Sequence, residues 1–280
     1  MYKIKNIIKA TWKHWREISF VYLIQLIVGS IVGFTFCAAL CSSFDTSMVL
    51  DHLAKGFDRT VIMDVMNSND NILDNTMRMG WLLLGIYLII SVLLQAGWLA
   101  NIKVNNFTVK SMLANGLKFF FPFLGIALIS ILLIIIYVAV VGFGFTKIVG
   151  DPLVTFSSEK PYVIWIIVLV GTFILWSITI WSWSVSTRFH YINGSPLFTS
   201  LKLGFNSVWN SLFKFIGIGL LLVAIHIILM CFYYLIMGDR GAPSWAIVII
   251  GIFVQQIFAF TRVAIRGLGY GMVEDLNSFN

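Results

Sequence analysis

Six long apolar stretches, separated by shorter polar segments, restrict most strongly how this chain can fold. A helix needs about 20 apolar residues to cross the roughly 30 Å hydrocarbon core of a bilayer. Transmembrane β-strands would instead give short segments of alternating polarity, unlike the continuous run 128–141. The predicted spans are 18–42, 80–100, 119–145, 161–187, 212–237 and 244 to about 264. The sequence therefore predicts an all-α, polytopic membrane bundle of about six transmembrane helices, forming a single domain over residues 1–280.

The composition favours lipid as part of the solvent. Only 11% of the residues are charged, whereas 59% are hydrophobic. A water-soluble domain carries roughly a quarter charged residues, because charges cover much of its surface. The net charge of +7 comes from residues scattered between the apolar stretches, without a dense basic tract. Nucleic-acid binding is therefore not expected.

Lys and Arg are distributed unequally between the two sides of the predicted membrane. Thirteen of the 19 fall in the N-terminal arm, the second and fourth connections and the C-terminal end. Basic residues are retained preferentially on the cytoplasmic side of a membrane. Both termini are therefore predicted to be cytoplasmic, and residues 43–79 are predicted to form an extracytoplasmic loop.

A short segment with an apolar stripe and basic margins precedes each odd-numbered span. Trp12 and Trp15 belong to the stripe of the first segment, residues 109–120 form the second, and Trp209 belongs to the third. These features are typical of amphipathic helices that lie at the headgroup boundary. Packing against the bundle would produce the same pattern and is the alternative.

The same arrangement recurs along the chain, which predicts an internal repeat of an interfacial helix followed by a transmembrane hairpin. The joint 123–129 (FLGIALI) parallels 215–221 (FIGIGLL). Thr187-Arg188 parallels Thr261-Arg262 at the ends of spans four and six, although the first unit has no such pair. The predicted pseudo-repeats are approximately 1–103, 104–193 and 194–280.

This layout, with its Phe-x-Gly-Ile joints and its arginines at helix ends, resembles bacterial six-span integral membrane families of unknown function. These families include the membrane domain found ahead of some glycerophosphodiester phosphodiesterases. The resemblance implies a helical membrane domain in the bacterial cytoplasmic (inner) membrane. It implies no catalytic residues.

The spans contain few ionisable side chains. No Asp, Glu, Lys or Arg lies near the middle of a span, which argues against transport coupled to a buried carboxylate. His226 is the ionisable side chain that lies deep in a span. We expect a neutral imidazole bonded to a nearby hydroxyl or backbone carbonyl, rather than a metal or proton site. Cys37 and Cys41 lie four residues apart on one helical face, where they are expected to be small lipid-compatible side chains rather than metal ligands. The four histidines are too scattered to form a metal-binding pair, and no cofactor is expected.

Uncharged polar side chains are more frequent within the spans. Ser182 lies in the serine-rich part of span four, and Gln255 and Gln256 lie in span six. Such groups usually form hydrogen bonds between helices, although they could also line a polar pathway. Together with His226, they form a candidate intramembrane polar site.

The first span contains a small-residue motif. Gly29 and Gly33 are four residues apart and share one helical face. This spacing allows two membrane helices to approach closely.

Three arginines mark the predicted cytoplasmic ends of spans four and six. Arg262 and Arg266 share one helical face, where they could hold anionic lipid headgroups. Anchoring of the helix ends explains them equally well. The candidate lipid or partner contacts are Arg188, Arg262, Arg266, Trp12, Trp15 and Trp209.

These observations predict a membrane protein that acts by associating with lipids, with other membrane proteins or with copies of itself, rather than as an enzyme. The runner-up is a permease or exporter of a small or amphiphilic solute, which would use the polar side chains of spans four and six. A membrane-embedded enzyme centred on His226 is the third interpretation.

Overall fold

The computed structural model describes residues 15–44, 70–102, 108–149, 159–237 and 245–278. These residues are helical apart from short turns, and they include no strand. The helices are α2 (Trp15–Phe44), α5 (Asp70–Asn101), α6 (Val109–Val149), α8 (Glu159–Ile192), α9 (Leu197–Asn210), α10 (Leu212–Met237) and α11 (Trp245–Ser278). All except α9 are long and apolar enough to cross a membrane. The predicted all-α class with six spanning helices is confirmed.

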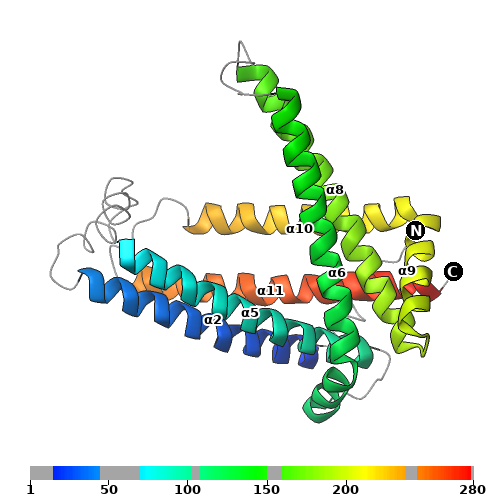
Figure 1. Ribbon diagram of the computed structural model, residues 1–280. Coiled ribbons are helices and arrows are strands. Elements are labelled where there is room, and N and C mark those ends of the chain that lie inside the picture. The colour runs from blue at the N-terminus through cyan, green and yellow to red at the C-terminus, as the bar shows by residue number, and fades with distance from the viewer. Residues whose placement is uncertain (1–14, 45–69, 103–107, 150–158, 238–244, 279–280) are drawn as a thin grey trace.

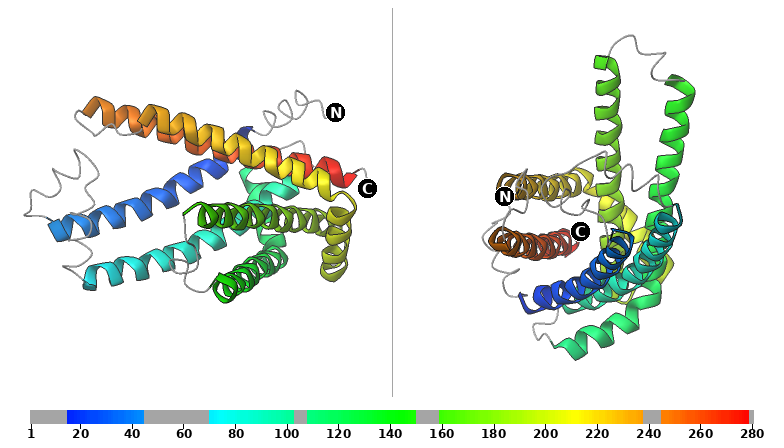
Figure 2. Two further views of the ribbon diagram at one scale, coloured as in Figure 1. Left: turned by 90° about the horizontal axis from the view of Figure 1, so that it is seen from above. Right: turned by 90° about the vertical axis from the view of Figure 1, so that its left-hand side faces the viewer.

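The six long helices form three hairpins, α2–α5, α6–α8 and α10–α11, and α9 connects the second hairpin to the third (Figure 1). α11 lies between α10 and α2, whereas α6 and α8 stand across the direction of α10 and α11 (Figures 1 and 2). Ring contacts join α6 to α8, including Tyr137 stacked on Trp176 at 5.4 Å between centroids. Each hairpin lies within one of the predicted pseudo-repeats, and the internal repeat stays a prediction.

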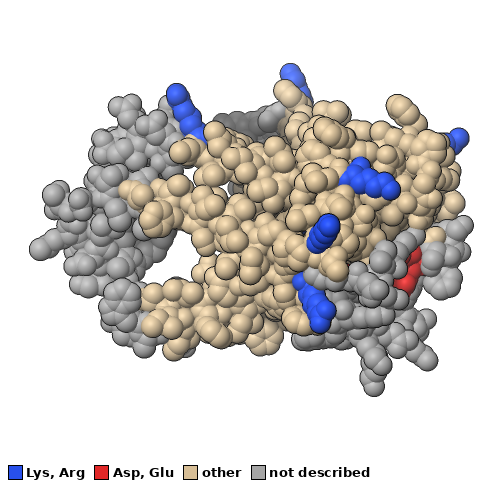
Figure 3. All heavy atoms as spheres, turned by 90° about the horizontal axis from the view of Figure 1, so that it is seen from below, with Lys and Arg blue, Asp and Glu red and all other residues tan. Residues whose placement is uncertain are grey.

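Among the described residues, the hydrophobic core joins the hairpins at one end. It is built from the first turns of α2, α6 and α10 and the last turns of α5, α8 and α11, together with Val208 of α9. Phe123 and Phe215, one from each predicted joint, are both buried there. The other halves of the helices expose large apolar side chains, and Figure 3 shows openings between them. Most Lys and Arg side chains visible in that view lie over the core end, which is the end predicted to be cytoplasmic.

Three helices extend by ten or more residues beyond a predicted limit. α5 begins at Asp70, within the predicted loop 43–79, of which residues 45–69 lie outside the described part of the chain. α6 joins the amphipathic segment 109–120 to the span without a break, although Pro122 lies inside it and lacks an N–H donor. α11 continues past the predicted end of span six because its last turns bury Tyr270 in the core.

α9 packs on α8 through small side chains. Ser200 and Gly204 are buried in α9, and a Cβ atom at Gly204 would overlap Thr187 of α8. The aromatic side chains of α9 point away from this contact, with Phe205 and Trp209 stacked at 5.9 Å between centroids. Trp209 is 67% exposed. α9 therefore binds the bundle by its small residues and leaves its aromatic side free.

Candidate functional site

A cavity of about 620 Å³ lies beside the core, between α2, α5, α8, α10 and α11. Its volume is within the range of about 300–1,000 Å³ that is usual for small-molecule sites. It lies where the helices begin to diverge from the core, so that helices from all three hairpins contribute to its walls. The cavity is therefore a direct consequence of the splayed arrangement.

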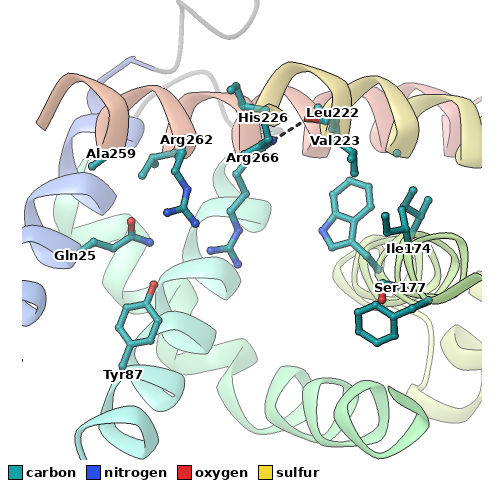
Figure 4. A pocket seen from close by; sticks show the side chains of 16 residues that line it. Gln25, Tyr87, Ile174, Ser177, Leu222, Val223, His226, Ala259, Arg262 and Arg266 are labelled. Carbon is teal, nitrogen blue, oxygen red and sulfur yellow. Dashed lines mark hydrogen bonds between the residues drawn. The ribbon is translucent and has the colours of Figure 1, made fainter. Parts of the chain in front are cut away.

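Four polar side chains converge on one side of this cavity (Figure 4). Arg262 and Arg266 point into it from α11, Gln25 points into it from α2, and Tyr87 points into it from α5. All four can donate hydrogen bonds, and the two guanidinium groups carry a permanent positive charge. This side of the cavity is suited to an anion.

The opposite side of the cavity is mainly apolar. α8 contributes Phe173, Ile174 and Trp181, and α10 contributes Leu222 and Val223. Their carbon atoms can accept an acyl or other hydrocarbon group, but they offer little to a small hydrophilic ion. The cavity as a whole is amphipathic and matches a ligand with one anionic end and one apolar end.

Arg266 is held in a fixed direction by Tyr270, one turn further along α11. The Nε atom of Arg266 donates a hydrogen bond of 2.6 Å to the Tyr270 hydroxyl oxygen. Gln95 of α5 donates a second bond of 2.8 Å to the same oxygen. Tyr270 is completely buried, and the ring of Trp98 packs against it edge-on at 5.4 Å. This arrangement leaves the two terminal nitrogens of Arg266 available to a ligand.

Arg188 lies behind the arginines of the cavity, at the end of α8. Only 4% of its surface is exposed, and its guanidinium carbon lies 5.3 Å from the centre of the Phe123 ring. It interacts electrostatically with Tyr270 and with Arg266. Its Nε atom is buried without a hydrogen-bond partner among the described residues. Arg188 therefore adds positive charge to the polar side of the cavity from within the core.

Within the described residues, no carboxylate neutralises these three arginines. Arg188 and Arg262 contact aromatic rings, and Arg266 contacts the ring and the hydroxyl of Tyr270. Removing charges from water without a counter-charge is costly by several kcal/mol per ion. The same part of the chain offers no cluster of His, Cys, Asp and Glu suited to a metal ion. The arrangement can hold an anion rather than a cation.

Comparison with known proteins finds no family model, curated protein or solved structure that matches this chain. The resemblance to bacterial six-span families therefore stays a prediction.

His226 lines the cavity from α10. Its Nδ1 atom lies 2.8 Å from the carbonyl oxygen of Leu222, one turn earlier in the same helix (Figure 4). Because a carbonyl oxygen only accepts, Nδ1 carries the proton of this hydrogen bond. The bonding to a backbone carbonyl is the arrangement expected from the sequence.

The other members of the predicted intramembrane polar site do not gather around His226. Ser182 is completely buried, and its hydroxyl has no hydrogen-bond partner among the described residues. Gln256 accepts a 2.7 Å hydrogen bond from the Tyr22 hydroxyl and ties α11 to α2. Gln255 is exposed. The structure therefore does not bring these four residues together, and Gln255 and Gln256, as neighbours in a helix, face different directions.

The candidate lipid contacts divide into two groups. Arg262 and Arg266 line the cavity, and Arg188 lies next to Arg266. Trp15 and Trp209 are 52% and 67% exposed and lie outside the cavity lining, on the outer surface. Trp12 lies outside the described residues.

Tyr87 and Tyr270 are the two tyrosines of the site, and the sequence predictions included neither of them. Each lies in or beside an apolar run, where a tyrosine is unremarkable in a membrane protein. Tyr270 bonds Gln95, which is 175 residues away in the chain. A contact between residues so far apart in the chain cannot be recognised from the spacing of neighbouring residues in the sequence.

Proposed function

We propose that this protein is an integral membrane protein that binds an anionic amphiphile, such as a membrane lipid, in the cavity between its three hairpins. The observation that carries the proposal is the pair Arg262 and Arg266 on one side of a cavity whose opposite side is apolar. The headgroup lies between the guanidinium groups, Gln25 and Tyr87, and the hydrocarbon chain lies against α8 and α10. The exposed apolar side chains on the outer halves of the helices would allow such a ligand to enter from the bilayer.

The proposed location is the bacterial inner membrane, with both termini in the cytoplasm. Support comes from the unequal distribution of Lys and Arg and from the convergence of the six basic-side helix ends in one core. In this orientation the end of α11 that follows Arg266 is cytoplasmic, and anionic lipids are found at the cytoplasmic headgroup boundary. The exposed aromatic side of α9, with Phe205 and Trp209, lies at the same boundary.

Replacing Arg262 and Arg266 together with glutamine is expected to reduce retention of anionic lipid at least about tenfold, because the two charge-assisted contacts are lost. Lipid bound to protein purified in a mild detergent is quantified by native mass spectrometry. The matched control removes Lys202 and Lys214, two exposed basic side chains of the same predicted side, in the same way. Equal retention by the two double variants would show that the arginines act only as topology anchors.

A permease for the same class of ligand is the second candidate. The observation that favours it is that the polar lining of the cavity includes His226, near the middle of span five. Movement of an amphiphile between leaflets of reconstituted vesicles, lost in the double arginine variant, would support transport. Binding without such movement would support the binding function and not the transport function.

The proposed orientation predicts which introduced cysteines a membrane-impermeant maleimide can reach. In a variant whose Cys37, Cys41 and Cys231 are replaced by alanine, Asp58→Cys is expected to react in intact cells. Ser278→Cys is expected to react only after permeabilisation, because the C-terminus is cytoplasmic. Reaction of Ser278→Cys in intact cells, with Asp58→Cys protected, would reverse the topology.

A further inference from the structure

We infer that the anionic end of the ligand is a phosphate monoester carried on a lipid, rather than a phosphate diester. This inference rests on the proposed function and makes its ligand class specific. A monoester carries about −1.5 to −2 charge near pH 7 and presents three strong acceptor oxygens. A diester headgroup carries a single negative charge and has two free oxygens.

The charge around the polar side of the cavity favours the monoester. Arg262 and Arg266 line the cavity, and Arg188 lies close enough to Arg266 to interact electrostatically. No carboxylate contacts these three side chains among the described residues. A single negative charge would leave most of this positive charge uncompensated beside apolar walls, whereas a dianion offsets much more of it.

The hydrogen-bond donors on this side point to the same group. Arg262 offers its planar set of N–H donors, and Arg266 offers the two terminal nitrogens that its bond to Tyr270 leaves free. The Gln25 amide and the Tyr87 hydroxyl face the same volume from α2 and α5 (Figure 4). Donors that arrive from three different helices match three terminal oxygens better than two.

The apolar walls indicate a lipid rather than a free phosphate ester. Phe173, Ile174 and Trp181 on α8 and Leu222 and Val223 on α10 would face water if a small hydrophilic phosphate filled the polar side alone. A hydrocarbon chain covers them and adds binding free energy in proportion to the apolar area removed from water.

The test compares lipids in nanodiscs of phosphatidylcholine that contain a minor fraction of phosphatidic acid or of phosphatidylglycerol. Phosphatidic acid is expected to bind about tenfold more tightly than phosphatidylglycerol at about pH 8, where the monoester is a dianion. This preference is expected to shrink towards about pH 5, where the monoester keeps one charge. Soluble glycerol phosphate is expected to compete poorly because it lacks the apolar chain.

The comparison of lipid affinities at different pH values needs a control for the protein's own titratable groups. The groups that face the cavity are Tyr87 on α5, His226 on α10 and the two arginines on α11, whereas α2 and α8 contribute the uncharged Gln25 and Ser177. Protonation of His226 would strengthen the binding of both anionic lipids at low pH. His226→Gln removes that effect, so a change in the ratio of the two affinities in this variant reports on the lipid phosphate.

The outcomes separate the two proposals. Equal affinity for both anionic lipids, with loss of binding in the Arg262→Gln, Arg266→Gln variant, overturns the monoester inference and keeps the proposed function. Failure of both anionic lipids to bind better than phosphatidylcholine overturns both. Tight binding of glycerol phosphate alone would replace the lipid by a soluble phosphate monoester.

Discussion

Replacing Arg188 with methionine is expected to raise the thermal stability of the ligand-free protein and to weaken its binding of anionic lipid. Arg188 is 4% exposed and lies near the like charge of Arg266, with its Nε atom unpartnered among the described residues. Replacing buried ionic groups with apolar side chains of similar volume is often neutral or stabilises proteins by about 1–4 kcal/mol, and the nearby like charge favours stabilisation here. Methionine is unbranched and can place its sulfur near the Phe123 ring, where the guanidinium lies now.

The same substitution removes positive charge from behind the ligand site. Lipid binding is therefore expected to fall although the protein becomes more stable, and a purely structural role of Arg188 would not give these opposite effects. Thermal unfolding in detergent and lipid binding in nanodiscs measure the two quantities on the same preparations. Arg188→Lys, which keeps the charge, is the control and should not be stabilised. If methionine lowers the melting temperature, the guanidinium is satisfied by contacts that outweigh its desolvation.

The fold could be predicted from the sequence because its determinants are local. An apolar run of sufficient length, such as 212–237, forms a helix wherever lipid is the solvent, since every backbone group must be satisfied within the segment. The residues at which helices end are harder to predict from the sequence, because they depend on which residues are buried by tertiary contacts. α11 continues to Ser278 in contact with the core, whereas the hydrophobic run from which span six was predicted ends near residue 264.

The angle between the hairpins could not be predicted. It depends on which helix faces meet, and a lipid-facing sequence is apolar all round. The Phe-x-Gly-Ile joints do occupy equivalent places, since both Phe123 and Phe215 are buried in the core. The parallel arginines do not, because Arg188 is buried and Arg262 is exposed. The same Thr-Arg sequence at two helix ends therefore places its arginine in a buried position in one case and in an exposed position in the other.

Half of the candidate site was within reach of sequence reasoning. Arg262 and Arg266 were predicted as anion contacts because their spacing of four puts them on one helical face. Their partners Gln25 and Tyr87 come from other hairpins, and no periodicity connects them to α11. The cavity exists because the hairpins share a core at one end and diverge beyond it, which is a property of the whole chain.

Close helix approach provides the second large effect, and it occurs at different glycines from those the sequence suggested. Gly29 and Gly33 have open space around them in the described structure. At Gly97 of α5, in contrast, a Cβ atom would overlap the backbone carbonyl oxygen of Met112 in α6. At Gly116 of α6, a Cβ atom would lie 2.8 Å from the carbonyl oxygen of Leu93. The two glycines therefore let α5 and α6 meet backbone to backbone.

Gly97→Ala is expected to destabilise the protein by about 1–3 kcal/mol, the usual range for overpacking, and Gly97→Leu is expected to prevent recovery of folded protein. The obstructing atom belongs to a backbone carbonyl, so no change of side-chain rotamer can relieve the overlap. Separation of α5 and α6 would also strain the 2.9 Å hydrogen bond from Asn115 to the buried Asn101.

The matched control is Gly85→Leu, in the same helix, where an added Cβ atom meets no neighbour within 4 Å. Helix propensity improves equally at both positions when glycine is replaced, so any difference between the two variants reports on helix contact. Monodispersity after detergent extraction and the melting temperature are the readouts. Loss of stability at Gly97 but not at Gly85 is expected.

Gly97→Ala should also disturb the support of Arg266, because Tyr270 accepts a hydrogen bond from Gln95, two residues before Gly97. A weaker preference for anionic lipid in the alanine variant would then connect the packing of α5 and α6 to the ligand site.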